Sequence, residues 1–196
     1  DDQLCKQGKG ITLYSSFKQN LKGDKIYTVF EDSEGDEWIL TNKGISIIGK
    51  KQVDSDFPFQ YIKEADGIIY LVSQSDKLAS YNFKTRQFKF IEIPYHVSMI
   101  NEVKKFDSNT LLLATDNGLI IYKIKEKEFQ LIDIRTSTQP SNVVQSVYQD
   151  HYKELWIFPQ TTGVIRYNPS TKEMQHLFTP ADEVIRYERK NKNVIF

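Results

Sequence analysis

Residues 111–122 read LLLATDNGLIIY, and residues 156–167, which lie 45 positions later, read WIFPQTTGVIRY. Each stretch is an apolar run, then a short turn that contains glycine, then a second run that closes on tyrosine. Two such runs joined by a short turn are typical of a β-hairpin. Similar hairpins occur at residues 70–81 (YLVSQSDKLASY) and 38–47 (WILTNKGISI). A hairpin that recurs about every 40 residues indicates a repeat architecture.

Further extended segments flank each hairpin. The segments before the hairpins mostly alternate apolar with polar residues and are expected to be innermost strands; they are residues 26–32, 59–64, 100–106 and 144–150. The segments after the hairpins have the pattern of edge strands and are residues 87–91, 128–132 and 174–178. Each repeat is therefore expected to contain four strands.

A single four-stranded sheet of about 40 residues cannot cover both of its own faces. Successive sheets must therefore stack face to face, and the twist of each sheet curves the stack into a ring. We predict an all-β fold, a β-propeller of four-stranded antiparallel blades, with a β-sandwich or a β-solenoid as the alternatives. In such a propeller, equivalent places in successive sheets should be held by Trp38, Tyr70, Leu111 and Trp156.

The repeat divides the chain into about four to five blades. Four blades are predicted at residues 24–56, 57–95, 96–140 and 141–179, with the end of one blade at 1–23 and the start of another at 180–196. Because the chain begins and ends inside a repeat, we expect it to be a fragment of a larger propeller. The alternative is a closed five-bladed ring, in which residues 184–196 pair with residues 10–14.

The composition excludes several classes of partner. Lys plus Arg and Asp plus Glu number 26 each, so no net charge attracts the chain to nucleic acid or to an anionic membrane. Cys5 is the single cysteine, so no disulfide can form within the chain. No stretch approaches the roughly 18 apolar residues of a spanning helix. We therefore expect no nucleic-acid binding and no direct membrane contact.

Motifs for metal binding and catalysis are missing or incomplete. Residues 32–37 (DSEGDE) have the acidic character of a calcium loop, but Lys43 stands where such a loop needs Glu, so a type I turn is expected instead. His96, His151 and His176 lie in three different repeats without ligand spacing. There is no Gly-x-Ser-x-Gly, Walker or His-Glu-x-x-His motif. We predict no metal, no cofactor and no enzymatic activity for this chain.

The tryptophans and the turn glycines each have two interpretations. Trp38 and Trp156 could stack on sugar rings, but at the start of the second strand of a blade a large ring is expected to fill the space between sheets. Gly44, Gly118 and Gly163 are expected at hairpin turns, where a positive φ is needed, and not in a phosphate cradle.

The repeats also show a family resemblance. Residues 29–38 (VFEDSEGDEW) and 147–156 (VYQDHYKELW), each followed by a turn with glycine, resemble the two-component regulator propeller repeat, and residues 163–171 (GVIRYNPST) are similar to its ending. The resemblance covers essentially the whole chain. The second and third repeats depart from the family pattern at Tyr70, Leu111 and Lys77.

The resemblance implies a function outside the inner membrane. In that family, such repeats form the periplasmic sensor region of Bacteroidetes hybrid two-component histidine kinases, whose usual signals are glycan fragments. It implies an extracytoplasmic ligand-sensing domain with an oligosaccharide ligand, in a parent receptor that carries a kinase and could form a homodimer. The alternatives are a protein-interaction scaffold without a small ligand and a propeller lyase or glycosidase.

A ligand is expected where loops converge at one mouth of the propeller. These are the loops between successive blades together with the central hairpin turns, and binding groups on rigid scaffolds are usually carried by such loops. They comprise residues 57–59, 95–96 and 136–141 and the turns at 42–43, 75–76, 116–117 and 160–162. The candidate ligand-binding residues are Tyr95, His96, Asp116, Asn117 and Gln160.

Overall fold

The computed structural model describes residues 21–177 except positions 51–52, 54, 66, 74, 83, 86, 138–139 and 162. This part of the chain is all β, with fifteen strands and no helix, and so it holds no helix that could cross a membrane. The partial blades predicted at residues 1–23 and 180–196, and the ring closure between residues 10–14 and 184–196, lie outside the described residues, apart from positions 21–23.

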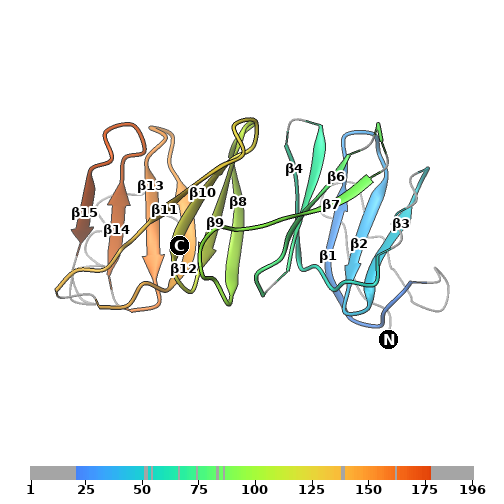
Figure 1. Ribbon diagram of the computed structural model, residues 1–196, viewed down its shortest axis with the longest axis horizontal. Helices are drawn as coiled ribbons and strands as arrows, with labels where there is room; N and C mark the ends of the chain where they lie inside the picture. Colours follow the sequence, from blue (N-terminus) through green and yellow to red (C-terminus); the bar gives the residue numbers. More distant parts are fainter. Residues whose placement is uncertain are drawn as a thin grey trace, which may run out of the picture.

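The strands form four antiparallel sheets that lie side by side in chain order (Figure 1). Sheet 1 consists of β1 (Ile26–Glu31), β2 (Glu37–Thr41) and β3 (Gly44–Ile48). Sheet 2 consists of β4 (Tyr61–Ala65), β5 (Ile68–Val72), β6 (Leu78–Asn82) and β7 (Gln87–Ile91). Sheet 3 consists of β8 (Ile100–Asp107), β9 (Thr110–Thr115), β10 (Gly118–Lys123) and β11 (Glu128–Ile132). Sheet 4 consists of β12 (Val144–Gln149), β13 (Leu155–Pro159), β14 (Val164–Tyr167) and β15 (Met174–Leu177).

Every sheet is a meander in which each strand pairs with the next strand along the chain. Sheets 2, 3 and 4 have the four strands that the sequence predicts, whereas sheet 1 has three among the described residues. Among the described residues after β3, Ser55 lies beside this strand, and its carbonyl oxygen accepts the N–H of Ile45 at 3.0 Å. The blade limits, which fall in loops, stay a prediction.

The pairing register shows which residues are equivalent. Trp38, Tyr70 and Trp156 do hold the same place, each opposite the same position of its inner strand, but Leu112 holds that place in sheet 3 and the predicted Leu111 is one residue too early. The error has a local cause. The turn between β13 and β14 is one residue longer than the turn between β9 and β10. The sequence offset of 45 therefore relates equivalent residues after the two turns, such as Gly118 and Gly163, but not the residues before them.

Three apolar clusters fill the spaces between the sheets. The cluster between sheets 1 and 2 contains Trp38, which is 0% exposed and meets the ring of Tyr81 edge-on at 5.4 Å. The cluster between sheets 2 and 3 contains Tyr70 and Tyr122, and the cluster between sheets 3 and 4 contains Leu112. Trp38, Tyr70 and Leu112 therefore each pack against the following sheet, which confirms the stacked blades and the space-filling interpretation of Trp38.

Hydrogen bonds also join the inner strands β1, β4, β8 and β12, which are neighbours in space. The Thr28 hydroxyl donates to the carbonyl oxygen of Gln60 at 2.7 Å, which links sheets 1 and 2. The Tyr61 hydroxyl donates to the carbonyl oxygen of Asn101 at 2.7 Å, and the Asn101 side chain donates to the carbonyl oxygen of Val144 at 2.7 Å. These bonds fix the spacing of the inner strands at the end where the loops converge.

Candidate functional site

Three of the five candidate residues lie together at one end of sheet 3. Both carboxylate oxygens of Asp116, in the turn between β9 and β10, accept the N–H of Ser98 at 3.1 and 3.2 Å. The side-chain amide of Asn117 donates to the carbonyl oxygen of His96 at 2.9 Å. We call this region, residues 95–99, 116–117, 140–143 and 160, the loop rim.

Asn142 holds the loop rim together, and the sequence did not single it out. Its side chain accepts the N–H of Ile134 at 2.9 Å and donates to Oδ1 of Asn117 at 3.0 Å, and its carbonyl oxygen accepts the N–H of Gly118. The side chain is 8% exposed. Little in the sequence indicates this role, because Asn142 belongs to no motif and lies just outside residues 136–141, the loop expected at the rim.

The two regular hairpin turns have the same construction. The Thr41 hydroxyl donates to the carbonyl oxygen of Gly44 at 2.9 Å, and the Thr115 hydroxyl donates to that of Gly118 at 2.7 Å. The φ angles of Gly44, Gly118 and Gly163 are 128°, 100° and 101°, which confirms that these glycines serve the turns.

Asp116 has a structural counterpart in sheet 1. Asn42 occupies the same place in its turn, and its side-chain oxygen accepts the N–H of Lys25 at 3.2 Å, as that of Asp116 accepts the N–H of Ser98. An amide and a carboxylate make the same contact in two sheets. The common role of this position is therefore to fasten the hairpin turn to the segment that leads into the inner strand.

The other two candidate residues, Gln160 and Tyr95, do not take part in the hydrogen bonds of Asp116, Asn117 and His96. Gln160 is exposed at the turn after β13, and its N–H donates to the carbonyl oxygen of Val143 at 2.9 Å, next to Asn142. Tyr95 is half-buried against the cluster between sheets 2 and 3, and its hydroxyl donates to the carbonyl oxygen of Phe129 at 3.0 Å. The structure thus places Gln160 in the loop rim next to Asn142 and turns the Tyr95 hydroxyl away from the rim, toward β11.

The loop rim is a fixed polar frame with exposed side chains around it. The side chains of Asp116, Asn117 and Asn142 are used in bonds within the protein, whereas His96 and Gln160 are exposed and Met99 is 44% exposed. Such an arrangement can present an imidazole, an amide and an apolar side chain to a ligand without reordering the loops.

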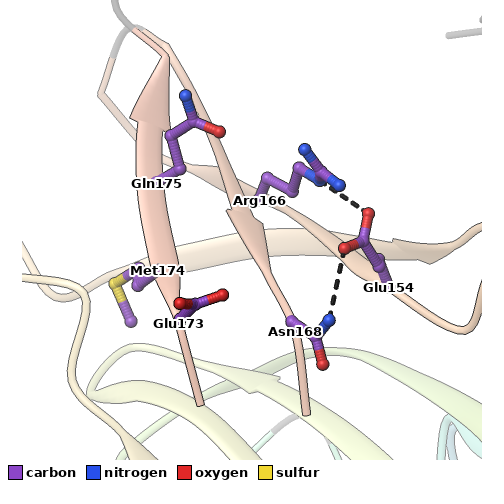
Figure 2. Close-up of a pocket in the computed structure, with 6 residues that line it drawn as sticks. All are labelled: Glu154, Arg166, Asn168, Glu173, Met174 and Gln175. Atoms are coloured by element: carbon purple, nitrogen blue, oxygen red, sulfur yellow. Dashed lines mark hydrogen bonds and ion pairs between the residues drawn. The ribbon is translucent and has the colours of Figure 1, made fainter. Parts of the chain in front are cut away.

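A pocket of about 350 Å³ lies elsewhere, on sheet 4. Figure 2 shows its lining, in which Arg166 points at Glu154 and Asn168 reaches the same carboxylate. Nε of Arg166 donates to Oε2 of Glu154 at 2.6 Å, and the side-chain amide of Asn168 donates to Oε1 of Glu154 at 3.4 Å. The remaining lining residues are Glu173, Met174 and Gln175. Because the guanidinium and the carboxylate satisfy each other, this pocket offers a ligand less than the loop rim does.

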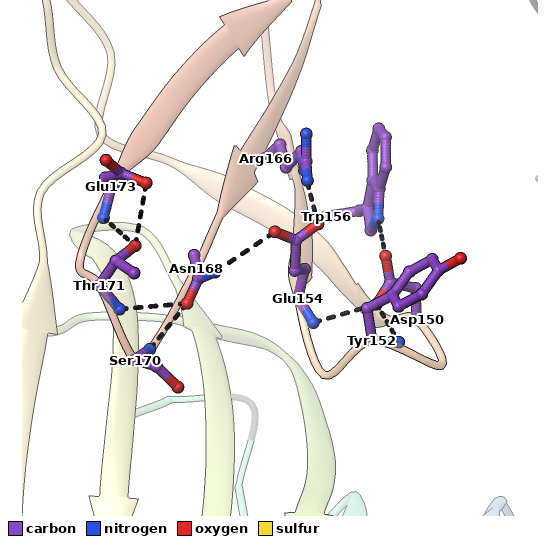
Figure 3. A network of polar contacts seen from close by, with 9 residues as sticks. All are labelled: Asp150, Tyr152, Glu154, Trp156, Arg166, Asn168, Ser170, Thr171 and Glu173. Carbon is purple, nitrogen blue, oxygen red and sulfur yellow. Dashed lines mark hydrogen bonds and ion pairs between the residues drawn. The ribbon is translucent and has the colours of Figure 1, made fainter.

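An Asp–Trp turn stands next to this pocket (Figure 3). The indole N–H of Trp156 donates to Oδ2 of Asp150 at 2.9 Å. The backbone N–H groups of Tyr152 and Glu154 donate to Oδ1 at 2.9 and 3.0 Å. The carboxylate therefore closes the turn and fixes the indole at the start of β13.

The same turn occurs in sheet 1. The indole N–H of Trp38 donates to Oδ2 of Asp32 at 2.7 Å, and Oδ1 accepts the N–H groups of Glu34 and Asp36. The N–H of Gly35 donates to the carbonyl oxygen of Asp32 at 3.0 Å, as in a β-turn. This confirms the turn expected at residues 32–37. Among the described residues, no group of three or more His, Cys, Asp or Glu is placed to hold a metal ion.

The hydrogen bonds to Asp150 also determine how it titrates. Burial pulls the pKa of Asp150 upward, but the bonds from Trp156 and from two backbone N–H groups outweigh burial. The pKa therefore lies below its ordinary value of 3.8. A carboxyl group whose pKa is lowered by folding stabilises the fold above its unfolded pKa, and this contribution disappears as the pH falls through the folded-state pKa.

Asp150→Asn is accordingly expected to lower the free energy of unfolding at pH 7, and the difference from the wild type should shrink as the pH falls below 3.8. Urea denaturation of both proteins from pH 7 to pH 2.5, with Asp107→Asn at the exposed end of β8 as control, measures it. A difference that stays constant over this pH range would contradict the role assigned to the carboxylate.

The comparisons with known proteins bear on the whole chain. No family model matches it. A curated relative, "Histidine kinase P4" of Formosa agariphila, is 23% identical over 187 residues, which are 95% of this chain and 11% of the kinase. The chain thus spans about a tenth of the length of that relative.

Solved structures match the fold over most of this chain. The extracellular domain of the hybrid two-component system BT3049 from B. thetaiotaomicron matches with a TM-score of 0.67 and 15% identity, over 92% of this chain and 27% of that one. The extracellular domain of BT4673 matches with a TM-score of 0.63 and 20% identity, over 82% of this chain and 22% of that one.

A match of comparable quality is an enzyme. Virginiamycin B lyase from Staphylococcus aureus matches with a TM-score of 0.66 and 16% identity, over 88% of this chain and 60% of the lyase. At these identities the likeness concerns the fold. The described part of the chain is therefore an all-β array of propeller blades, and the matches to the kinase and to the two extracellular domains confirm its resemblance to two-component regulator propellers.

Proposed function

We propose that the chain is a ligand-sensing propeller region of a two-component sensor, located in the periplasm, and that its ligand is a glycan. The family resemblance of the repeats supports the sensor role, as do the matches to a histidine kinase and to two extracellular domains of hybrid two-component systems. Binding without catalysis accords with a loop rim whose carboxylate, Asp116, is already bonded to Ser98.

The single observation that carries the proposal is the construction of the loop rim. Asn142 and Asn117 lock three loops into one frame, and His96 and Gln160 stand exposed beside that frame. A sugar needs several hydrogen-bonding groups in fixed positions, because each of its hydroxyls must exchange bonds with water for bonds with protein. A frame that is already ordered avoids much of the entropy cost of binding.

A glycan ligand should raise the melting temperature of the chain. At about 100 times its dissociation constant, a ligand that binds only the folded state adds roughly 2.7 kcal/mol of stability, and each kcal/mol corresponds to roughly 2–4 °C in a protein of this size. Differential scanning fluorimetry against a panel of oligosaccharides measures this shift. We expect the shift to fall by more than half in His96→Ala and in Gln160→Ala.

Lys105→Ala is the matched control, since Lys105 is exposed near the other end of β8. It should keep the full shift. A panel without any stabilising glycan would overturn the proposal, and turnover of a panel member by the purified chain would replace it with an enzymatic function related to that of the lyase.

A second candidate function, a protein-interaction scaffold, is favoured by one observation. Phe90 on the outer strand β7 is 51% exposed although it adjoins the rings of Phe57, Phe59 and Phe88. Exposed aromatic side chains are frequent in protein interfaces. Light scattering that shows a defined assembly without any glycan, and loss of that assembly in Phe90→Ser, would support this alternative.

A further inference from the structure

The inner strands place four residues at one level of the stack. In the neighbouring strand of their own sheet, they lie opposite Trp38, Tyr70, Leu112 and Trp156; the four residues are Phe30, Lys63, Lys104 and Tyr148, in that order. They are thus equivalent to one another, and their strands β1, β4, β8 and β12 are successive neighbours. In the order of the strands, the two cationic residues, Lys63 and Lys104, follow each other, with an aromatic residue before them and another after them.

Lys63 is the unusual member of this series. It is half-buried, and among the described residues no hydrogen bond or ion pair of its ammonium group is found. Desolvation lowers the pKa of Lys63, and Lys104 lowers it further, while Glu102 partly opposes them. A partly buried ammonium without a close partner destabilises a protein, so its presence calls for a group that compensates the charge.

The neighbouring carboxylate cannot supply that compensation fully. One oxygen of Glu102 lies 2.9 Å from the ammonium of Lys104. The other accepts the N–H of Val147 at 3.0 Å. Glu102 is therefore shared between a strand of sheet 4 and one lysine, and the pair of lysines retains a positive charge on this side of the inner strands.

Tyr148 adds a feature that a simple anion would not need. Its side chain is 57% exposed, and it follows Val147, whose N–H binds the carboxylate that holds Lys104. An exposed aromatic ring next to cationic groups fits a ligand that has both an apolar face and a negative charge. A pyranose ring that carries a carboxylate or sulfate group has both.

We infer that the inner strands bind an acidic sugar, with its anionic group between Lys63 and Lys104 and its ring against Tyr148. The inference rests on the proposed glycan-sensing function and names the class of glycan. It also separates this site from the loop rim, since Lys63 and Lys104 lie within β4 and β8, whereas the rim residues lie in the loops before β8 and β12 and in the turns after β9 and β13.

Calorimetric titration with two matched pairs of ligands tests the inference. The first pair is trigalacturonate and its methyl ester, and the second is lactose 6′-sulfate and lactose; inorganic sulfate is a fifth probe for the anion alone. At least one acidic sugar should bind at least ten times more tightly than its neutral counterpart and than inorganic sulfate, and its affinity should fall as NaCl is added.

Variants then assign the site. Lys63→Met and Lys104→Gln should each weaken the acidic sugar at least tenfold, and Tyr148→Ala should weaken it while leaving the salt dependence intact. Lys89→Gln, on the outer strand of the sheet that holds Lys63, should bind like the wild type. Lys63→Met is also expected to melt at a higher temperature than the wild type, because it removes the desolvated charge, so loss of binding cannot be ascribed to unfolding.

The outcomes separate the two proposals. Equal binding of acidic and neutral sugars, or full binding by Lys63→Met, overturns the inference, and the sensing function stands if His96→Ala abolishes that binding. If the rim variants lose binding of the acidic sugar while the lysine variants keep it, the inference alone is likewise overturned. If none of the oligosaccharides binds, the inference and the proposed function fail together.

Discussion

Trp38→Ala is expected to lower the free energy of unfolding by about 3–5 kcal/mol, the usual cost of removing a large buried ring. The indole of Trp38 is 0% exposed, meets the ring of Tyr81 in the next sheet and donates to Asp32. Its removal leaves a cavity between sheets 1 and 2 and an acceptor without its donor. Urea denaturation followed by far-ultraviolet circular dichroism measures the loss.

Trp156→Ala provides the comparison within the same protein. Trp156 holds the equivalent place and makes the equivalent bond, to Asp150, but its ring is only half-buried. We expect this variant to cost about 2 kcal/mol, because less apolar surface returns to water. Since the chain has 2 tryptophans, each variant leaves the emission of the other as a local probe. Equal losses in both variants would contradict the packing described for Trp38.

Gly44→Ala should have the second largest effect, a loss of about 3 kcal/mol. The φ of Gly44 is 128°, a region that residues with a side chain rarely adopt, and a Cβ there would stand 2.1 Å from the carbonyl oxygen of Ser55. This oxygen belongs to the backbone, so the chain itself must move to make room for the Cβ. That movement breaks the hydrogen bond between the N–H of Ile45 and the carbonyl oxygen of Ser55. Equilibrium denaturation in urea gives the change in stability.

Gly35→Ala separates strain from collision. Gly35 also has a positive φ, 86°, but a Cβ at this position meets nothing within 4 Å. Only the conformational cost of the left-handed region remains, about 1–2 kcal/mol. If the two alanine variants were equally stable, the close approach of residue 55 to the turn would not be the cause of the loss at Gly44.

The fold was predictable from sequence because its signals are local and repeated. Hairpins with apolar runs, turn glycines and Asp–Trp turns recur, and the structure has strands and turns where they recur. The error at Leu111 shows the limit. A run of three leucines has the same pattern in two registers, so only the pairing with β8 shows that Leu112 faces the next sheet.

The candidate site was less accessible to sequence reasoning. The rim positions follow from the topology of a propeller, and His96, Asp116 and Asn117 do lie together. Their roles depend on bonds between residues far apart in the chain, such as the one from Asn142 to Asn117, which no local pattern encodes. Lys63 was also missed, because a lysine in an alternating strand is expected to be solvent-exposed unless the neighbouring sheet is known.

The order of the sheets has a consequence for how the chain acquires its structure. Each sheet pairs only strands adjacent in sequence, and each of the three apolar clusters joins two consecutive sheets. Folding can therefore begin at any one hairpin pair and spread in either direction, with each new sheet adding one interface at a time. A chain built in this way can assemble as it leaves the ribosome, since no sheet among residues 26–177 waits for a distant strand.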